Sequence, residues 1–420
     1  MTPSRSITTP PQASQPAATG MMLPSREQTL AAVNALLPRY EALLAELIRF
    51  DSTYGNEGPM QRRVAAEMER LGISVEIVTS RPDGHALNLG GRIIGKDPAR
   101  HLSLVLNAHA DVVPVDAAER WPHEPFGGTI KDRTIYGRGA QDDKAGVTVL
   151  LLVVEALGRL GVSLPGDLVV QVVIEEETTG NGTRALLDRG YRGDGVVICD
   201  GTWPERLYYA HPGHISFRLR IAGDAMAASN ERRAINPVLL GMEMITRLRA
   251  AATDRNLDAP AFEGIPAPYF VNVGAFHAGV WCGSVPAEAT LDVQMGFPPP
   301  ATAASMMAEV KAMAAGISER IVVEPWLLTR EPFIGDPDAP LIRHLREVVQ
   351  RHAQGEVQVV PITGYTDMAF FGTPNVTLYG PGGGRNGHGV DEHYMLDHMG
   401  GVAANLVTFA VEWCSRPRQA

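Results

Sequence analysis

Cysteine is scarce in this sequence, and clustered positive charge is missing. The three cysteines among 420 residues are isolated, with no C-x-x-C pair, which excludes a disulfide framework and a cysteine zinc site. The 37 basic residues, 33 of them arginine, form no basic patch, and the net charge is −10. We therefore expect a reducing compartment, the cytoplasm, and no nucleic-acid partner.

Long apolar segments are missing as well. The longest runs, such as residues 147–154, are far shorter than the roughly 20 residues that span a bilayer, so we expect no membrane partner. Residues 1–25 are rich in Pro, Ser, Thr and Ala and lack the apolar centre of a signal peptide. We interpret residues 1–25 as a disordered tail.

The rest of the chain is globular in composition, with 45% hydrophobic and 20% charged residues, and it is too long for one ordinary domain. Buried β-rich runs alternate with helical patterns in residues 26–210 and again in residues 330–420. This order predicts an α/β fold, doubly wound about a central, mainly parallel sheet. Residues 211–329 instead follow a β-α-β-β-α-β order, which predicts an inserted ferredoxin-like α+β domain.

Polar side chains end three of the predicted buried strands. They are the pair His109 and Asp111, the run Glu175-Glu176-Glu177, and Asp200. In open α/β sheets, ligands bind at the edge where parallel strands end. Because residues two apart on a strand point the same way, we expect His109 and Asp111 on one face.

Each of these motifs is weak by itself. Three adjacent acids are commonly a solvated turn, and a histidine in a Gly-rich loop, such as His388, is commonly a surface residue. A bound divalent cation changes the balance, because it makes clustered acids favourable. With a loop aspartate added, the candidate metal ligands are two imidazoles and three carboxylates: His109, Asp142, Glu177, Asp200 and His388.

This set of donors suits zinc, with manganese or cobalt as replacements, and it does not suit calcium. Five ligands are too many for one catalytic zinc that keeps an open position. They fit two divalent metals that share one carboxylate.

Sequence blocks around these residues resemble those of a known family. The blocks are HADVVP, PFGG…YGRGAQDDKAG, EEETTGNG, CDGT, GYTD, GPGG and GHGVDEH. From about residue 27 to its end, the chain resembles the zinc peptidases and amidohydrolases that include acetylornithine deacetylase, succinyl-diaminopimelate desuccinylase, aminoacylase and carboxypeptidase G.

The resemblance implies a role for each metal ligand. Asp142 would bridge the two metals, with His109 and Asp200 completing one site and Glu177 and His388 the other. It also implies a cis peptide between Asp142 and the next residue. The inserted domain would act as a lid and join two subunits into a homodimer.

Two further acids would take part in the chemistry. Asp111 would accept a hydrogen bond from His109 and so fix its tautomer. Glu176 would be the general base, which deprotonates a metal-bridging water and hands the proton to the leaving amine.

The inserted domain departs from the family pattern at two places. Ala227 stands where relatives carry a histidine that reaches the partner's active site, and losing such a donor costs about 100- to 1,000-fold in turnover. Residues 294–296 lack an arginine that in relatives grips a substrate carboxylate. Either the substrate lacks that carboxylate or turnover is poor. Besides position 227, the candidate substrate contacts are Asn272, Gly364, Thr366 and Gly382, and a turn cap is an equal alternative for Thr366.

The main hypothesis is a dinuclear metal hydrolase, with its metals held by residues 26–210 and 330–420. It would cleave an amide of a small N-acyl, N-formyl or dipeptide-like substrate. One alternative is an exopeptidase that acts on longer peptides. Another is a metal-loaded binding protein with weak turnover, suggested by Ala227. The intact Glu176 argues against the binding protein, because a retired site has no need of a base.

Overall fold

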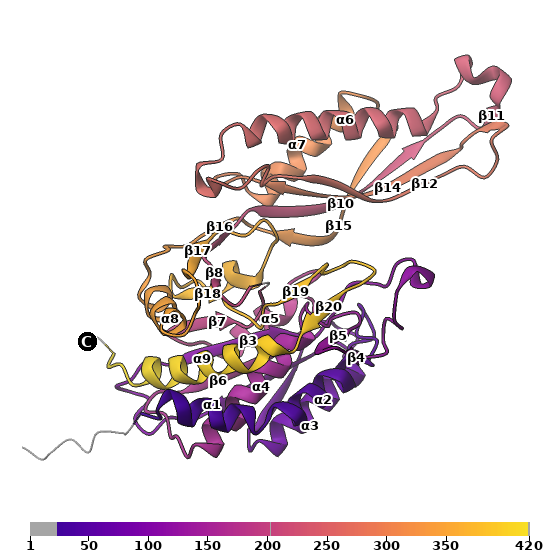
Figure 1. The fold of residues 1–420 in the computed structure, drawn as a ribbon. Coiled ribbons are helices and arrows are strands. Elements are labelled where there is room, and N and C mark those ends of the chain that lie inside the picture. The colour runs from indigo at the N-terminus through magenta and orange to yellow at the C-terminus, as the bar shows by residue number, and fades with distance from the viewer. Residues whose placement is uncertain (1–22, 202, 419–420) are drawn as a thin grey trace, which may run out of the picture.

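The computed structural model describes residues 23–201 and 203–418, so most of the predicted tail lies outside the described residues. Figure 1 shows a larger body, built from both ends of the chain, and an elongated unit above it, built from the middle of the chain. None of the helices in the described residues is both long enough and apolar enough to cross a membrane.

The larger body is organised around an eight-stranded sheet. Its strands, in spatial order, are β1 (Val75–Thr79), β2 (Leu87–Ile93), β6 (Leu168–Val173), β3 (Leu104–His109), β7 (Gly195–Ile198), β18 (Val376–Leu378), β8 (Arg206–Tyr208) and β17 (Gln358–Val360). The central strands β6, β3, β7 and β18 run parallel to one another. Strand β2 pairs antiparallel with β1 and β6, and β8 pairs antiparallel with β18. The predicted mainly parallel sheet is confirmed.

Helices cover both faces of this sheet, as the doubly wound pattern predicts. One face carries α1 (Arg26–Asn34), α2 (Leu37–Ile48), α3 (Gly58–Arg70), α4 (Lys144–Arg159), α8 (Pro340–Gln350) and α9 (Asp397–Cys414). The other face carries α5 (Asn181–Asp188) and the 3-10 helix η4 (Asp367–Phe370). Alternation along β3 serves both layers, because Leu104 and Leu106 face the first and Val105 faces the second.

Helix α4 lies at the centre of the larger core. Thirteen of its 16 residues are buried, as expected for a helix that is apolar on all sides. Its N-cap is Asp143, whose carboxylate accepts the backbone N–H of Gly146. The helix therefore begins two residues after Asp142.

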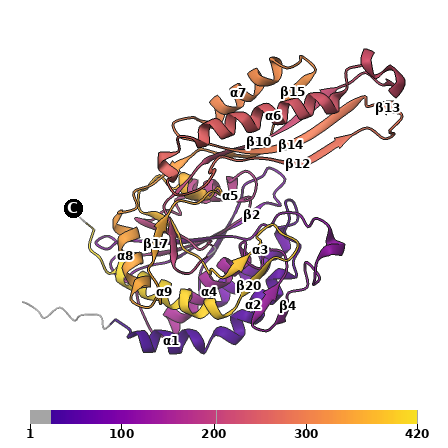
Figure 2. The ribbon, with the colours of Figure 1, turned by 45° about the horizontal axis from the view of Figure 1, so that its top comes forward.

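The inserted unit has the predicted ferredoxin-like fold. Its elements, in chain order, are β10 (Gly213–Ala222), α6 (Pro237–Asn256), β12 (Val271–Ala278), β14 (Glu288–Phe297), α7 (Ala303–Ala315) and β15 (Ile321–Arg330). The four strands form an antiparallel sheet in the order β12-β14-β10-β15. Helices α6 and α7 pack side by side on one face of it (Figure 2). The chain thus enters by β10 and leaves by its neighbour β15.

The sequence patterns gave no sign of the smaller elements. They are the sheet β19 (Gly384–Arg385), β20 (His393–Met395), β5 (Thr134–Tyr136) and β4 (Thr129–Lys131), the pairs β11 (Met226–Ala227) with β13 (Ser284–Val285) and β9 (Ala210–His211) with β16 (Phe333–Ile334), and the 3-10 turns η1 (Ala118–Arg120), η2 (Ala228–Arg233) and η3 (Pro260–Phe262). The four-stranded sheet joins segments that are about 260 residues apart in the chain.

The core around α4 generates a stability prediction. Leu150 is fully buried there, so Leu150→Ala should lower the free energy of unfolding by about 2–5 kcal/mol through lost burial and a residual cavity. Leu257→Ala is the matched control, because Leu257 is 82% exposed and should change stability by no more than about 0.5 kcal/mol. Urea unfolding followed by circular dichroism measures both. Equal midpoints for the two variants would contradict the assignment of α4 to the core.

Candidate metal centre

The predicted ligands meet at the carboxyl edge of the parallel strands. Strand β3 ends at His109, the turn after β6 carries Glu177, and Asp200 follows β7. The loop after β18 reaches His388. Because these four strands are parallel neighbours, their ends lie at one edge of the sheet, where ligands bind in open α/β folds.

The five predicted ligands form two groups that share Asp142. One group is His109, Asp142 and Asp200, and the other is Asp142, Glu177 and His388; within each group the ligand atoms lie within 4.8 Å of one another. Nε2 of His109 is 2.9 Å from Oδ1 of Asp142, whereas Nε2 of His388 is 3.2 Å from Oδ2. The shared carboxylate thus offers one oxygen to each group.

The position of Asp142 is set by its neighbour in the chain. The Asp142–Asp143 peptide is cis, as the resemblance implied. The Asp143 carboxylate caps α4 and also accepts the backbone N–H of His109, at 3.2 Å. Asp143 therefore joins the start of α4 to the end of β3. No role was predicted for Asp143, although an aspartate directly before a helical run is a usual sign of an N-cap.

His109 is buried, and both of its ring nitrogens have partners. Nδ1 is 3.0 Å from the backbone oxygen of Asp111 and 3.5 Å from its carboxylate, so the nearer acceptor is the carbonyl and not the predicted side chain. The Asp111 carboxylate accepts the backbone N–H groups of Glu176 and Glu177, at 3.3 and 3.1 Å. Asp111 thereby ties the end of β3 to the turn after β6.

The three adjacent acids after β6 point to different partners. Glu175 is fully buried 3.3 Å from the guanidinium of Arg81. Glu177 places Oε1 2.8 Å from Nε2 of His388, while its Oε2 accepts the hydroxyl of Tyr365 at 3.1 Å. Glu176 is 7% exposed, and burial raises its pKa well above the ordinary value of a glutamate. Glu175 and Glu177 thus face different partners, whereas the buried Glu176 carboxylate still experiences the charge of Glu177.

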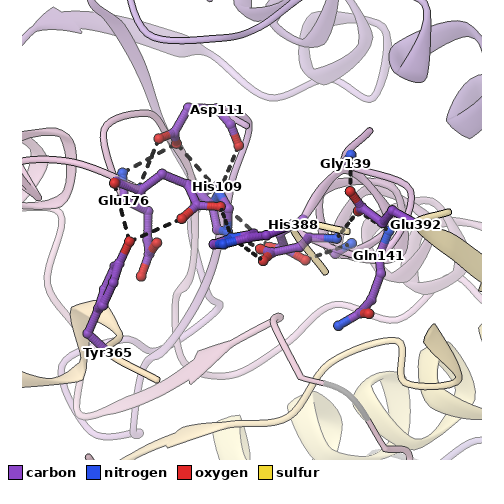
Figure 3. A network of polar contacts seen from close by, with 12 residues as sticks. His109, Asp111, Gly139, Gln141, Glu176, Tyr365, His388 and Glu392 are labelled. Carbon is purple, nitrogen blue, oxygen red and sulfur yellow. Dashed lines mark hydrogen bonds and ion pairs between the residues drawn. The ribbon is translucent and has the colours of Figure 1, made fainter. Parts of the chain in front are cut away.

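Tyr365 is a site residue that sequence reasoning missed. It lies in the GYTD block between two residues that were considered, and its aromatic character beside Thr366 was the available signal. Figure 3 shows Tyr365 and Asp111 on one side of the two histidines and Glu392 on the other.

Crowded charges govern the electrostatics of the centre. The Glu177 carboxylate raises the pKa of His388 to about 11. Burial, together with the charge of Asp142, raises the pKa of Asp200 to about 7. Burial alone would lower the pKa of His109, but its hydrogen bonds to Asp111 and Asp142 raise it well above the ordinary value. These shifts favour protonated carboxyl groups and protonated imidazoles in the site. Divalent cations would stabilise such a cluster of carboxylates.

The weaker sequence candidates are dispersed. Thr366 is buried and caps η4, because its Oγ1 accepts the backbone N–H of Met368 at 3.1 Å. Gly364 is exposed just before Tyr365, and Gly382 is buried with a positive φ of 62°. Asn272 is exposed on the edge strand β12, and Ala227 is exposed on β11, at the far end of the inserted unit in Figure 1.

A cavity of about 520 Å³ opens beside the shared carboxylate. Its lining residues are Gln141, Asp142, Trp203, Gly384, Asn386, Gly387 and His388. A cavity of this size accepts a small molecule next to the two ligand groups.

Comparison with known proteins agrees with this arrangement. The family model described as Peptidase family M20/M25/M40 matches residues 105–412. An N-formyl-4-amino-5-aminomethyl-2-methylpyrimidine deformylase from Bacillus subtilis is 25% identical over 402 residues, covering 87% of this chain and 91% of the relative. Human carnosine dipeptidase 1 has a similar fold, with a TM-score of 0.79, 16% identity and coverage of 93% of this chain and 100% of that one.

A dinuclear metal-binding peptidase of the same family from Bacillus subtilis also shares the fold. Its TM-score is 0.61 at 14% identity, and the match covers 90% of this chain and 98% of that one. The chain therefore belongs to peptidase family M20/M25/M40, a metal-dependent family, and it is a hydrolase that cleaves amide bonds.

Proposed function

We propose that this chain is a dinuclear metal hydrolase that removes a formyl or other small acyl group from an amine, or splits a dipeptide-like amide. The observation that carries the proposal is the meeting of two ligand groups on Asp142, with buried Glu176 alongside. The similar deformylase and the similar dipeptidase support a small amide as substrate. The three cysteines are free, which fits the cytoplasmic location that we also propose.

The residues of the centre fit two zinc ions, with manganese or cobalt as replacements. His109 and Asp200 would hold one ion, Glu177 and His388 the other, and Asp142 would hold both. When bound, such metals polarise an amide carbonyl and lower the pKa of water.

Glu176 is placed to move the proton. Unlike its neighbours, it is engaged neither by Arg81 nor by His388, and burial raises its pKa, as is common for carboxyl groups that accept and return a proton in catalysis. Its carboxylate would take a proton from the attacking water and give it to the leaving nitrogen. Its backbone is fixed on both sides, because its N–H donates to Asp111 and its carbonyl accepts Nη2 of Arg330 at 2.7 Å.

We further propose that residues 211–329 form a lid and the interface of a homodimer. Within the part of the chain that the structure describes, strand β12 pairs only with β14 and is therefore an edge strand. Phe276 on this strand is 38% exposed, and Trp281 in the loop that follows is 70% exposed. An exposed edge strand with apolar side chains is a ready template for pairing with a second copy.

The proposed reaction can be tested on the purified protein with added zinc. N-formyl amines, N-acyl amino acids and dipeptides should be hydrolysed, and tetrapeptides should not. Glu176→Gln should retain two metals per chain and lose about 100- to 10,000-fold in kcat, because the base is gone while the ligands remain. Elemental analysis and the rates are measured on the same samples. A variant that keeps its rate would remove Glu176 as the base, and tetrapeptide cleavage alone would favour an exopeptidase.

Metal binding should release protons. At pH 7 His388 of the metal-free protein carries a proton, because its pKa of about 11 lies well above that pH, and only the neutral imidazole binds a metal. Calorimetric titration with zinc in buffers of different ionisation enthalpy should show release of about one proton or more per chain, and affinity should rise from pH 6 to pH 8. His388→Gln should release fewer protons, whereas His85→Gln, at an exposed loop position, should behave like the unchanged chain. Binding heats that are independent of the buffer would contradict His388 as a ligand.

The homodimer predicts a mass of twice the 45.2 kDa chain by light scattering at micromolar concentration. Phe276→Glu should yield monomers, because it places a charge on the proposed interface. Val322→Glu is the matched control on β15, the opposite edge of the same sheet, where Val322 is 52% exposed. A monomeric mass for the unchanged chain would refute the dimer.

A further inference from the structure

A buried ion pair lies between the two chain segments that carry Asp142 and His388. Arg138 and Glu392 are each 1% exposed, and Nη1 of Arg138 donates to Oε2 of Glu392 at 2.6 Å. The two residues are 254 positions apart in the chain. Neither has a place among the candidate ligands, the base or the substrate contacts.

The Glu392 carboxylate holds the loop that leads to the shared ligand. Oε2 accepts the backbone N–H of Gly139 at 3.0 Å in addition to Arg138. Oε1 accepts the N–H groups of Gln141 at 3.0 Å and of Asp142 itself at 3.1 Å. Both oxygens of this carboxylate therefore hold the loop, and one of them contacts the backbone of Asp142 directly.

Arg138 connects the same carboxylate to the other ligand. Its Nη2 donates to the backbone oxygen of His388 at 3.2 Å and reaches that of Pro114 at 3.4 Å, while the indole of Trp121 lies over the guanidinium. His388 needs such support, because its side chain is 50% exposed and its backbone adopts a positive φ of 65° that non-glycine residues rarely take. A planar guanidinium can bridge the two acceptors, which a lysine ammonium on a flexible chain cannot do in the same way.

We propose that Arg138 and Glu392 are positioning residues, a clamp that sets the distance between Asp142 and His388 and thereby the affinity of the centre for its metals. This inference rests on the proposed function. The two side chains have different roles in this proposal. Glu392 acts on Asp142, which both ligand groups share, whereas Arg138 acts on His388, which belongs to one group only.

Titration of the metal-free chain with Co²⁺, followed by visible absorption, tests the clamp without relying on activity. Glu392→Gln keeps the shape of the side chain but replaces one acceptor oxygen with a donor. The affinity for both Co²⁺ ions should fall by about 10- to 100-fold, as is usual when a residue that supports metal ligands is lost. Arg138→Lys keeps the charge beside Glu392 but loses the bridge to the His388 carbonyl. This variant should lower the affinity for one Co²⁺ ion by a similar factor and change the affinity for the other by no more than about threefold.

Glu67→Gln is the matched control. Glu67 is also a buried carboxylate held by arginines, Arg39, Arg63 and Arg70, and it lies on α3, away from the centre. This variant should lower the melting temperature and leave both Co²⁺ affinities unchanged.

Hydrolysis by Glu392→Gln should return toward the kcat of the unchanged chain at saturating Co²⁺, with the substrate KM unaltered, because the substitution lowers only the occupancy of the metal sites.

The outcomes separate the clamp from the proposed function. If the unchanged chain binds two Co²⁺ ions and both clamp variants bind them equally well, the clamp is overturned and the hydrolase proposal stands. If the variants lose only thermal stability, as Glu67→Gln does, the pair is structural and the clamp is again overturned. If the unchanged chain takes up no Co²⁺, the proposed function fails, and the clamp fails with it. If Glu392→Gln does not fold, the one-ion loss expected for Arg138→Lys still decides the question.

Discussion

Repulsion among carboxylates is the constraint on which the rest of this structure depends. Asp142, Glu176, Glu177 and Asp200 converge in a small and mostly buried space, where unpaired negative charges would be costly. Histidines and backbone N–H groups face the carboxylates and offset part of their charge. The raised pKa values of Asp200 and His388 indicate that negative charge remains, which bound cations would balance. A centre of this kind is poorly satisfied by protein groups alone.

The parallel sheet brings the metal ligands together. Parallel strands bring their carboxyl ends to one edge of the sheet, so ligands separated by about 280 residues meet there. The residue after the shared aspartate, Asp143, is the buried N-cap of helix α4 and anchors that part of the chain to the core. Rigid elements, and not loops alone, therefore hold the ligands whose spacing matters most.

Much of this was readable in the sequence. Apolar runs such as 167–174 predicted the buried strands, and the polar residues that end them predicted where His109 and Asp200 would lie. The resemblance supplied what spacing could not, the prediction that Asp142 is shared between the two ligand groups and the different roles that we propose for Glu176 and Glu177. Local periodicity in the sequence could not predict contacts that depend on the tertiary fold.

The residues that were missed share that dependence. Arg138 and Glu392 meet across 254 positions, and the sheet that contains β5 and β20 forms only when both segments are already in place. Two- and three-residue strands such as β9 and β11 are too short for a period to show. The GYTD block marked Tyr365 as a residue near the site, but its partner Glu177, 188 positions away, was visible only in the structure.

The chain enters the inserted unit by β10 and leaves it by β15, and these two strands pair directly, with His214 opposite Arg330. Its two attachment points are therefore adjacent in space, so the chain of the larger body is interrupted without being stretched. Evolution could have acquired, lengthened or exchanged this module with little disturbance to the parent sheet, because only a short closure separates the uninterrupted form from the interrupted one. The metal centre and the inserted unit are in that sense free to diverge at different rates.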